Sequence, residues 1–141
     1  ATVGYVHAGE LTLEQSFGYQ GGKDVTPQYV VGRVGRAGRS WFSYDLPVDP
    51  AHPMTLVATY YSADRRTSPA SFEILVDGQR IADQTVERTD PGHFYDVQYQ
   101  VPASLVQGKS KVTVRLQAKE GSQIAAVFGV RMVRGDELLA D

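Results

Sequence analysis

Residues 72–87, FEILVDGQRIADQTVE, decide the fold of this chain, because they combine two strand-like runs with a tight turn. The turn is Asp77-Gly78, a dipeptide that accepts the positive φ angles of a two-residue hairpin. Before the turn, Phe72, Ile74 and Val76 share one face, since side chains in a strand alternate between its two faces. The return run alternates less cleanly, so we expect it to be the less buried arm of the hairpin.

Further alternating runs on both sides of the hairpin predict additional strands around it. These runs are residues 41–48, 54–61, 95–101 and 111–118. Residues 124–133 are apolar on nearly both faces, which is typical of a central strand between two covered surfaces. Proline first and glycine last in residues 102–108 predict a single helical turn. About eight short strands without a convincing helix predict an all-β fold, an antiparallel β-sandwich of jelly-roll type.

The length of 141 residues fits one domain, residues 1–141, that can bury a core without covalent staples. Residues 1–40 are rich in glycine and predict irregular strands and loops; the run GRVGRAGR at 32–39 should be loop or an irregular edge. Residues 41–133 carry the core strands. Residues 134–141 form a tail that is frayed or a short helix.

Composition limits the partners that this chain can have. A net charge of −2 argues against a general nucleic-acid binder, which carries a basic excess. No apolar run approaches the roughly 18 residues that a membrane span needs, so a membrane partner is not expected either. Because the sequence contains no cysteine, disulfides and thiolate metal sites are excluded.

Several of the strand runs resemble a known protein family. They are WFSYDL at 41–46, LVATYY at 56–61, FEILVDG at 72–78, YQVP at 99–102 and GKSKVTVR at 108–115. Over residues 35–133 the chain resembles the accessory C-terminal β-sandwich domain of β-L-arabinofuranosidase-type (family 127) glycoside hydrolases, which is similar in shape to galactose-binding-like carbohydrate-binding modules. The chain departs from that pattern at Tyr61 and Gly35, where tryptophan is expected.

The resemblance implies a non-catalytic carbohydrate-binding or accessory module, because those enzymes keep their catalytic residues in a separate helical barrel. The implied partners are a catalytic glycosidase domain and a glycan that contains arabinose, galactose or uronate. The implied location is secreted or periplasmic in a bacterium. The alternative is a structural module that docks on a catalytic domain or self-associates without its own sugar ligand. For an independent enzyme the sequence shows no glycine-flanked serine nucleophile.

Strand alternation also predicts where a ligand would bind. If successive strands are antiparallel, one end of the sandwich collects residues 33–40, 62–69, 88–93 and 119–123. This end is rich in arginine, whose guanidinium group bonds hydroxyl or carboxylate oxygens beside aromatic rings that stack on sugars. The expected ligand-binding residues are Arg36, Trp41, Tyr61, Arg65, Arg66 and His93. The alternative is that these charges only solvate loops or face another domain.

No cofactor is expected apart from a structural calcium ion. Its oxygen ligands would be Glu10 and Glu14 near the start of the chain and Asp136 near its end. These acids follow no recognisable calcium-loop pattern, so surface charge is the default interpretation. The three histidines are far apart in sequence and none forms a pair with helical metal spacing, which argues against a zinc site.

Overall fold

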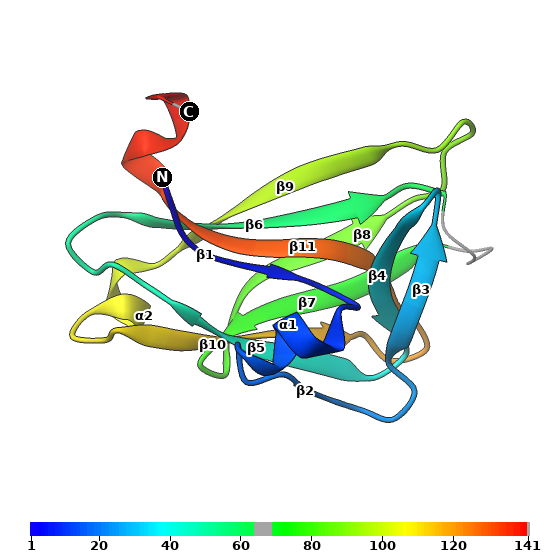
Figure 1. Ribbon diagram of the computed structural model, residues 1–141, viewed down its shortest axis with the longest axis horizontal. Helices are drawn as coiled ribbons and strands as arrows, with labels where there is room; N and C mark the ends of the chain where they lie inside the picture. Colours follow the sequence, from blue (N-terminus) through cyan, green and yellow to red (C-terminus); the bar gives the residue numbers. More distant parts are fainter. Residues whose placement is uncertain (64–68, 141) are drawn as a thin grey trace.

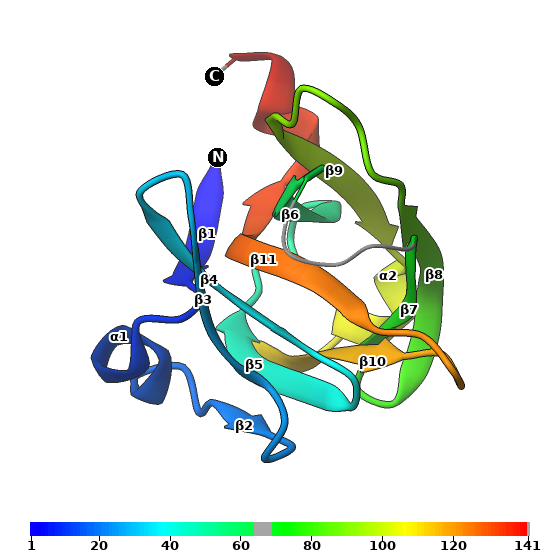
Figure 2. The ribbon, with the colours of Figure 1, turned by 90° about the vertical axis from the view of Figure 1, so that its right-hand side faces the viewer.

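A computed structural model describes the backbone of residues 1–63 and 69–140 and the side chains of residues 1–63 and 69–137. Two antiparallel sheets lie face to face in this part of the chain (Figure 1, Figure 2). This architecture confirms the predicted all-β sandwich of jelly-roll type. The described residues contain eleven strands rather than about eight.

Six strands form the first sheet: β1 (Thr2–His7), β3 (Thr26–Val30), β4 (Arg33–Gly38), β6 (Met54–Tyr61), β9 (Phe94–Val101) and β11 (Ile124–Arg134). Their order is β3-β4-β11-β6-β9, and β1 pairs with the part of β11 that β4 leaves free. Five strands form the second sheet: β2 (Gln20–Gly21), β5 (Trp41–Pro47), β7 (Ala70–Val76), β8 (Gln79–Val86) and β10 (Lys111–Ala118). Their order is β2-β5-β10-β7-β8.

Three short helices complete the described part of the chain: α1 (Leu11–Gln15), α2 (Ala103–Val106) and the 3-10 helix η1 (Gly135–Ala140). Helix α2 is the single turn predicted between a proline and a glycine, and η1 is the short helix predicted for the tail. Among the described residues, no helix combines the length and the apolar character that crossing a membrane requires.

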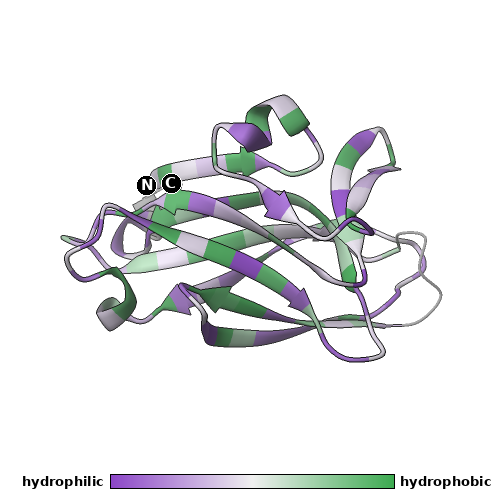
Figure 3. Ribbon diagram, turned by 90° about the horizontal axis from the view of Figure 1, so that it is seen from below, coloured by the Kyte–Doolittle hydropathy of each residue, from purple (hydrophilic) through white to green (hydrophobic). Residues whose placement is uncertain are grey.

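The core lies between the two sheets, because each strand turns every second side chain inward. Hydrophobic and hydrophilic residues accordingly alternate along several strands (Figure 3). On β5 the inward residues are Phe42, Tyr44 and Leu46, and on β10 they include Val114 and Leu116. All five are almost completely buried. The period-two pattern of the sequence therefore identifies the core faces of these strands correctly.

The hairpin at residues 72–87 forms as predicted, with β7 and β8 as its two strands. Asp77 and Gly78 occupy its turn with φ angles of 48° and 82°, the left-handed region that this dipeptide tolerates. Strand β8 lies at the edge of the second sheet and is the less buried arm, as expected. The centre of each sheet belongs instead to β10 and β11, and β11 is the predicted strand that is covered on both faces.

The first 40 residues are more regular than the sequence predicted. The glycine-rich run at 32–39 was expected to be loop or an irregular edge, but most of it forms β4, which pairs with both β3 and β11. Glycine serves close packing here, because a Cβ atom on Gly35 would lie 2.7 Å from the carbonyl oxygen of Val127. The glycines thus allow a strand to approach its neighbour rather than interrupting it.

The alternation of β10 predicts unequal effects for two adjacent substitutions. Val114 is fully buried, so Val114→Ala should lower the free energy of unfolding by about 1–3 kcal/mol through lost methyl contacts and a partial cavity. Thr113 lies on the opposite face, where its hydroxyl donates a 2.7 Å hydrogen bond to Asp45. Thr113→Ala should therefore cost about 1 kcal/mol or less. Urea unfolding followed by circular dichroism measures both, and equal costs would contradict the register of β10.

Candidate functional site

Every second connection between strands emerges at one end of the sandwich, as expected for antiparallel strands, and we call this the loop end. Trp41 at the start of β5 pairs with Gln117 near the end of β10, and Tyr61 at the end of β6 pairs with Phe94 at the start of β9. The connections 39–40, 87–93 and 119–123 therefore emerge on the same side of the molecule. Loops held by a rigid sandwich are a frequent location for binding residues.

Beside the loop end, the first sheet carries a small apolar cluster on its outer face, away from the main core. This outer cluster consists of buried Val30, Ala126 and Phe128, with Ala37, Tyr61 and Phe94 packed against it. Alternation along β11 turns Phe128 to this face beside a β-bulge, where Val127 pairs with Tyr60 and Gly129 already pairs with Thr59. The hairpin of β3 and β4 contributes Val30 and Ala37 to the cluster and brings Gly35 against Phe128.

Arg33, at the start of β4, lies across two aromatic rings of the outer cluster. Its guanidinium carbon is 4.4 Å from the ring centre of Phe94 and 5.5 Å from that of Phe128. Stacking of this kind stabilises the cation by about 0.5–2 kcal/mol and holds the planar group in a defined orientation. No described residue accepts a hydrogen bond from the Arg33 guanidinium or pairs with it as a carboxylate. Its N–H donors remain available for a ligand.

The Arg33 side chain lines a shallow cleft of about 450 Å³, which we call the Arg33 cleft. The other lining residues are Thr59, Phe94, Tyr95 and Asp96. Asp96 accepts a 2.6 Å hydrogen bond from the Thr59 hydroxyl and lies 3.7 Å from the Arg131 guanidinium. This carboxylate is already engaged, whereas the guanidinium of Arg33 is not.

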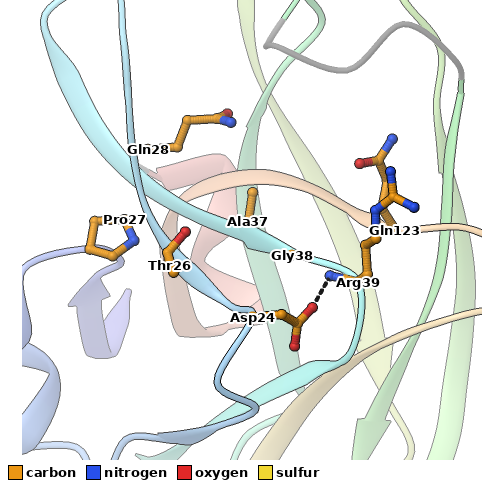
Figure 4. A pocket seen from close by; sticks show the side chains of 8 residues that line it. All are labelled: Asp24, Thr26, Pro27, Gln28, Ala37, Gly38, Arg39 and Gln123. Carbon is orange, nitrogen blue, oxygen red and sulfur yellow. Dashed lines mark hydrogen bonds between the residues drawn. The ribbon is translucent and has the colours of Figure 1, made fainter.

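A second cleft, of about 380 Å³, opens on the other side of the outer cluster, and we call it the Arg39 cleft. It is lined by Asp24, Thr26, Pro27, Gln28, Ala37, Gly38, Arg39 and Gln123. Figure 4 shows the amide of Gln28 on one side of Ala37 and the ends of Arg39 and Gln123 on the other. Since Ala37 also packs on the outer cluster and Phe94 lines the Arg33 cleft, the two clefts flank one apolar patch.

Some polar groups in the Arg39 cleft have hydrogen-bond partners and others do not. Asp24 accepts a hydrogen bond from the Ser40 hydroxyl and another, of 2.6 Å, from the backbone N–H of Arg39. These bonds hold the pKa of Asp24 below its usual range. In contrast, the side-chain oxygen of Gln28 is buried without a hydrogen-bond donor among the described residues. A buried acceptor without a partner is uncommon and costly, which suits a position that a ligand completes.

Arg36, expected to bind a ligand, is instead a buried structural residue, and that prediction is wrong. Its guanidinium group donates to both carboxylate oxygens of Glu14, at 2.8 and 2.6 Å, and lies 4.3 Å from the ring centre of Tyr19. It is 4% exposed and Glu14 is 0% exposed. Alternation along β4 turns Arg36 inward, where the buried carboxylate compensates its charge.

Trp41 and Tyr61 do not share a surface, although both lie near the loop end. Trp41 belongs to the second sheet and points outward, with the Arg115 guanidinium 4.1 Å from its ring centre. Tyr61 belongs to the first sheet and packs on Phe94 at 4.6 Å in the outer cluster. Outward side chains of the two sheets face opposite sides of a sandwich, so only Tyr61 lies beside the two clefts.

His93 lies in the connection before β9, close to the outer cluster. Its Nδ1 atom is 3.2 Å from the Ser62 hydroxyl, and its ring centre is 5.4 Å from that of Tyr95. His93 therefore lies at the loop end beside Tyr95, which packs against the main core, whereas Tyr61 lies on the outer face of the first sheet. Both remain candidate ligand residues. Arg65 and Arg66 lie outside the described residues.

The three acids expected to hold calcium are not brought together, so that site is wrong. Glu14 is buried in its ion pair with Arg36, and Glu10 is an exposed residue that precedes α1. Asp136 lies in η1 and contacts the Nδ1 atom of His52 at 3.1 Å. Figure 1 and Figure 2 both show α1 and η1 on different sides of the molecule.

The residues that line the two clefts were mostly missed by the sequence predictions. A signal existed for Phe94 and Asp96, because alternation puts them on the face of β9 opposite the core residues. Arg33 was visible only as part of an arginine-rich run. Gln123 lies in the connection 119–123 that was expected at the loop end. Nothing in the sequence indicated Gln28, since the Arg39 cleft depends on how β3 and β4 pair in the first sheet.

Comparison with known proteins adds a family and a fold. A family model described as a family of unknown function (DUF6805) matches residues 1–133. No curated protein matches the chain by sequence.

Three solved structures share the fold. The family 35 carbohydrate-binding module from Clostridium thermocellum has a TM-score of 0.62 at 11% identity, over 94% of this chain and 99% of that chain. The CBM22-1 xylan-binding domain of Xyn10C from Paenibacillus barcinonensis has a TM-score of 0.60 at 12% identity, over 94% and 93%. Carbohydrate-binding module CBM36, in complex with calcium and xylotriose, has a TM-score of 0.60 at 12% identity, over 93% and 100%. At these identities the similarity establishes the fold alone.

Proposed function

Because the chain belongs to DUF6805, a family of unknown function, its role has to be argued from its own residues, and we propose that it is a non-catalytic carbohydrate-binding module. One observation carries the proposal. The Arg33 guanidinium lies over the Phe94 ring without a hydrogen-bond acceptor among the described residues, beside an apolar patch that two polar clefts flank. This combination suits a sugar, because hydroxyl groups need oriented hydrogen bonds and the ring faces need an apolar surface.

The fold supports this proposal without deciding it. The structural neighbours are carbohydrate-binding modules, and the CBM36 structure among them holds xylotriose. Fold alone does not determine function, so the ligand must be argued from the site. As further parts of the proposal, the glycan contains arabinose, galactose or uronate, a catalytic glycosidase domain accompanies the module, and the protein is secreted or periplasmic in a bacterium.

The proposal predicts that two similar aromatic residues have different effects on binding. Phe94 and Trp41 are both half-buried rings under a stacked arginine, but they lie on opposite outer faces of the sandwich. Phe94→Ala should weaken glycan binding at least about tenfold, or about 1.4 kcal/mol, since it removes the support of Arg33 and part of the apolar patch. Trp41→Ala should leave binding unchanged. Affinity gels containing arabinan, galactan, xylan or polygalacturonate measure both variants.

Circular dichroism melts of both variants show whether the fold is retained. Loss of binding in Trp41→Ala alone would move the site to the second sheet. No retention of the unmodified protein on any of these gels would reject a glycan ligand. The docking alternative would then gain support, since Tyr29 and Val31 beside the β3–β4 turn are 70% and 71% exposed and offer apolar contacts to a partner.

A further inference from the structure

Apart from Arg88, which has an interaction of its own, the arginines of the described residues divide into those with a carboxylate partner and those without one. Arg36, Arg80, Arg131 and Arg134 each have a carboxylate oxygen within 4 Å. Arg115 is held by the amide oxygen of Gln117, at 2.9 and 2.6 Å, on the outer face of the second sheet. Arg33 and Arg39 have neither kind of partner for their guanidinium groups within the described part of the chain.

The two unpaired guanidinium groups lie in the two clefts that flank the outer cluster. Arg33 begins β4 and Arg39 directly follows its last residue, so their backbones are about 20 Å apart at about 3.3 Å per residue. Between them, Ala37 and the rings of Tyr61 and Phe94 form a partly exposed apolar surface. The clefts are therefore the two ends of one elongated surface along β4.

Two carboxylates also belong to this surface and would oppose an anionic ligand. Asp96 lies in the Arg33 cleft and Asp24 in the Arg39 cleft. Asp96 is hydrogen-bonded to Thr59 and neutralised by Arg131, while the oxygens of Asp24 accept from the Ser40 hydroxyl and the Arg39 backbone. Among the described residues of this surface, the charged groups without a hydrogen-bonded or ionic partner are thus the guanidinium groups of Arg33 and Arg39, and the buried side-chain oxygen of Gln28 also lacks a donor.

We propose that this surface binds an acidic glycan chain that lies along β4, with carboxylate groups of the glycan on Arg33 and Arg39. This inference rests on the proposed carbohydrate-binding function and names the class of glycan. A guanidinium group binds a carboxylate through two parallel hydrogen bonds, which is stronger and more directional than its contact with a neutral hydroxyl. Because the backbones of Arg33 and Arg39 are about 20 Å apart, an oligosaccharide rather than a single sugar is needed to engage both side chains.

The test compares ligands that differ only in charge or in length. Isothermal titration would use the whole chain with hexagalacturonate, with the same hexamer in its fully methyl-esterified and therefore neutral form, and with the free-acid dimer. The acidic hexamer should bind at least about tenfold more tightly than either comparator. Raising the salt concentration from 50 to 500 mM should weaken acidic-hexamer binding about tenfold and leave any neutral binding unchanged.

Matched variants locate the contact. Arg33→Gln and Arg39→Gln should each reduce affinity for the acidic hexamer about tenfold and have little effect on the esterified hexamer. Arg80→Gln is the control, because it removes the same charge from an exposed side chain of the second sheet, where Arg80 pairs with Asp83 at 2.9 Å. It should leave binding unchanged.

The outcomes separate the two levels of the proposal. Equal affinity for the acidic and esterified hexamers, or binding of neutral glycans alone, would overturn the acidic ligand while keeping a carbohydrate-binding module. Unchanged affinity in both Arg33→Gln and Arg39→Gln would overturn the site along β4. Absence of binding to every glycan, acidic or neutral, would reject the carbohydrate-binding function itself.

Discussion

Glu14→Gln is expected to lower the free energy of unfolding by about 3–5 kcal/mol, because it leaves a buried guanidinium group without its counter-charge. The Glu14 carboxylate is fully buried and receives hydrogen bonds from Arg36 at 2.8 and 2.6 Å, from the Tyr44 hydroxyl at 2.5 Å and from the Gly9 backbone at 3.1 Å. These partners come from β4, β5 and the segment after β1, so Glu14 ties α1 to both sheets. Urea unfolding followed by circular dichroism gives the free energy.

Two variants make this measurement specific to the buried pair. Glu10→Gln makes the same chemical change at an exposed residue just before α1 and should cost less than about 0.5 kcal/mol. The double variant Glu14→Met with Arg36→Met should recover much of the loss, because replacing both members of a buried ion pair by apolar residues is often nearly neutral. If Glu14→Gln lowered the free energy of unfolding by less than about 1 kcal/mol, the buried ion pair would not be needed for stability.

The Glu14 carboxylate should also make the free energy of unfolding depend on pH. Burial on its own would raise the pKa of Glu14, but the hydrogen bonds from Arg36, Tyr44 and Gly9 outweigh burial and bring this pKa below its ordinary value of 4.5. A lowered pKa in the folded state means that Glu14 stabilises the fold above about pH 4.5 and that this contribution disappears as the pH falls further. The free energy of unfolding, measured over a series of pH values, should therefore fall less steeply below pH 4.5 in Glu14→Gln than in the unmodified protein.

Phe128→Ala is expected to cost about 3–5 kcal/mol, although Phe128 lies outside the main core. Its ring is fully buried, contacts Phe94 at 5.0 Å and lies against Gly35 of β4. Removing the ring leaves a cavity beneath the β3–β4 hairpin and takes away one of the two rings that support Arg33. The variant should therefore weaken ligand binding in addition to stability.

Hydrogen exchange can distinguish local from global loosening in this variant. We expect the amides of β3 and β4 to lose protection much more than those of β10, because the hairpin depends on the outer cluster for its packing. Phe72→Ala is the matched control, since Phe72 is a fully buried phenylalanine in the main core. It should lower protection throughout the sandwich, and a uniform loss in Phe128→Ala as well would contradict a separate outer cluster.

Much of the fold follows from local patterns in the sequence. The period-two alternation predicts that Val114 is buried and Thr113 is not, and the Asp77-Gly78 dipeptide predicts the turn between β7 and β8. Both succeed because they depend on backbone geometry within a few residues. The grouping of alternate loops at one end follows in the same way, since antiparallel neighbours reverse direction at every connection.

The candidate site could not be predicted to the same extent. Alternation shows that a side chain leaves one face of its strand, but it does not show which sheet the strand joins. That is why Trp41 and Tyr61 were expected on one surface and are found on opposite faces. The Arg33 and Arg39 clefts depend on the pairing of β4 with β11, in which Arg36 lies opposite Val127, 91 positions later in the chain.

Arg36 is the clearest case of a residue whose location depends on contacts between distant parts of the chain. In the sequence it is one of several arginines in a glycine-rich run, and surface exposure was the reasonable expectation for an isolated charge. The chain places Glu14, 22 positions earlier, within 2.6 Å of it, and a charge can be buried when a partner compensates the lost hydration. The strands, their inward faces and the hairpin turn can be predicted from the sequence, because each depends on residues that are neighbours in the chain. The long-range pairing of charges and sheets determined that Arg36 lies in the core and that Arg33 and Arg39 line the two clefts.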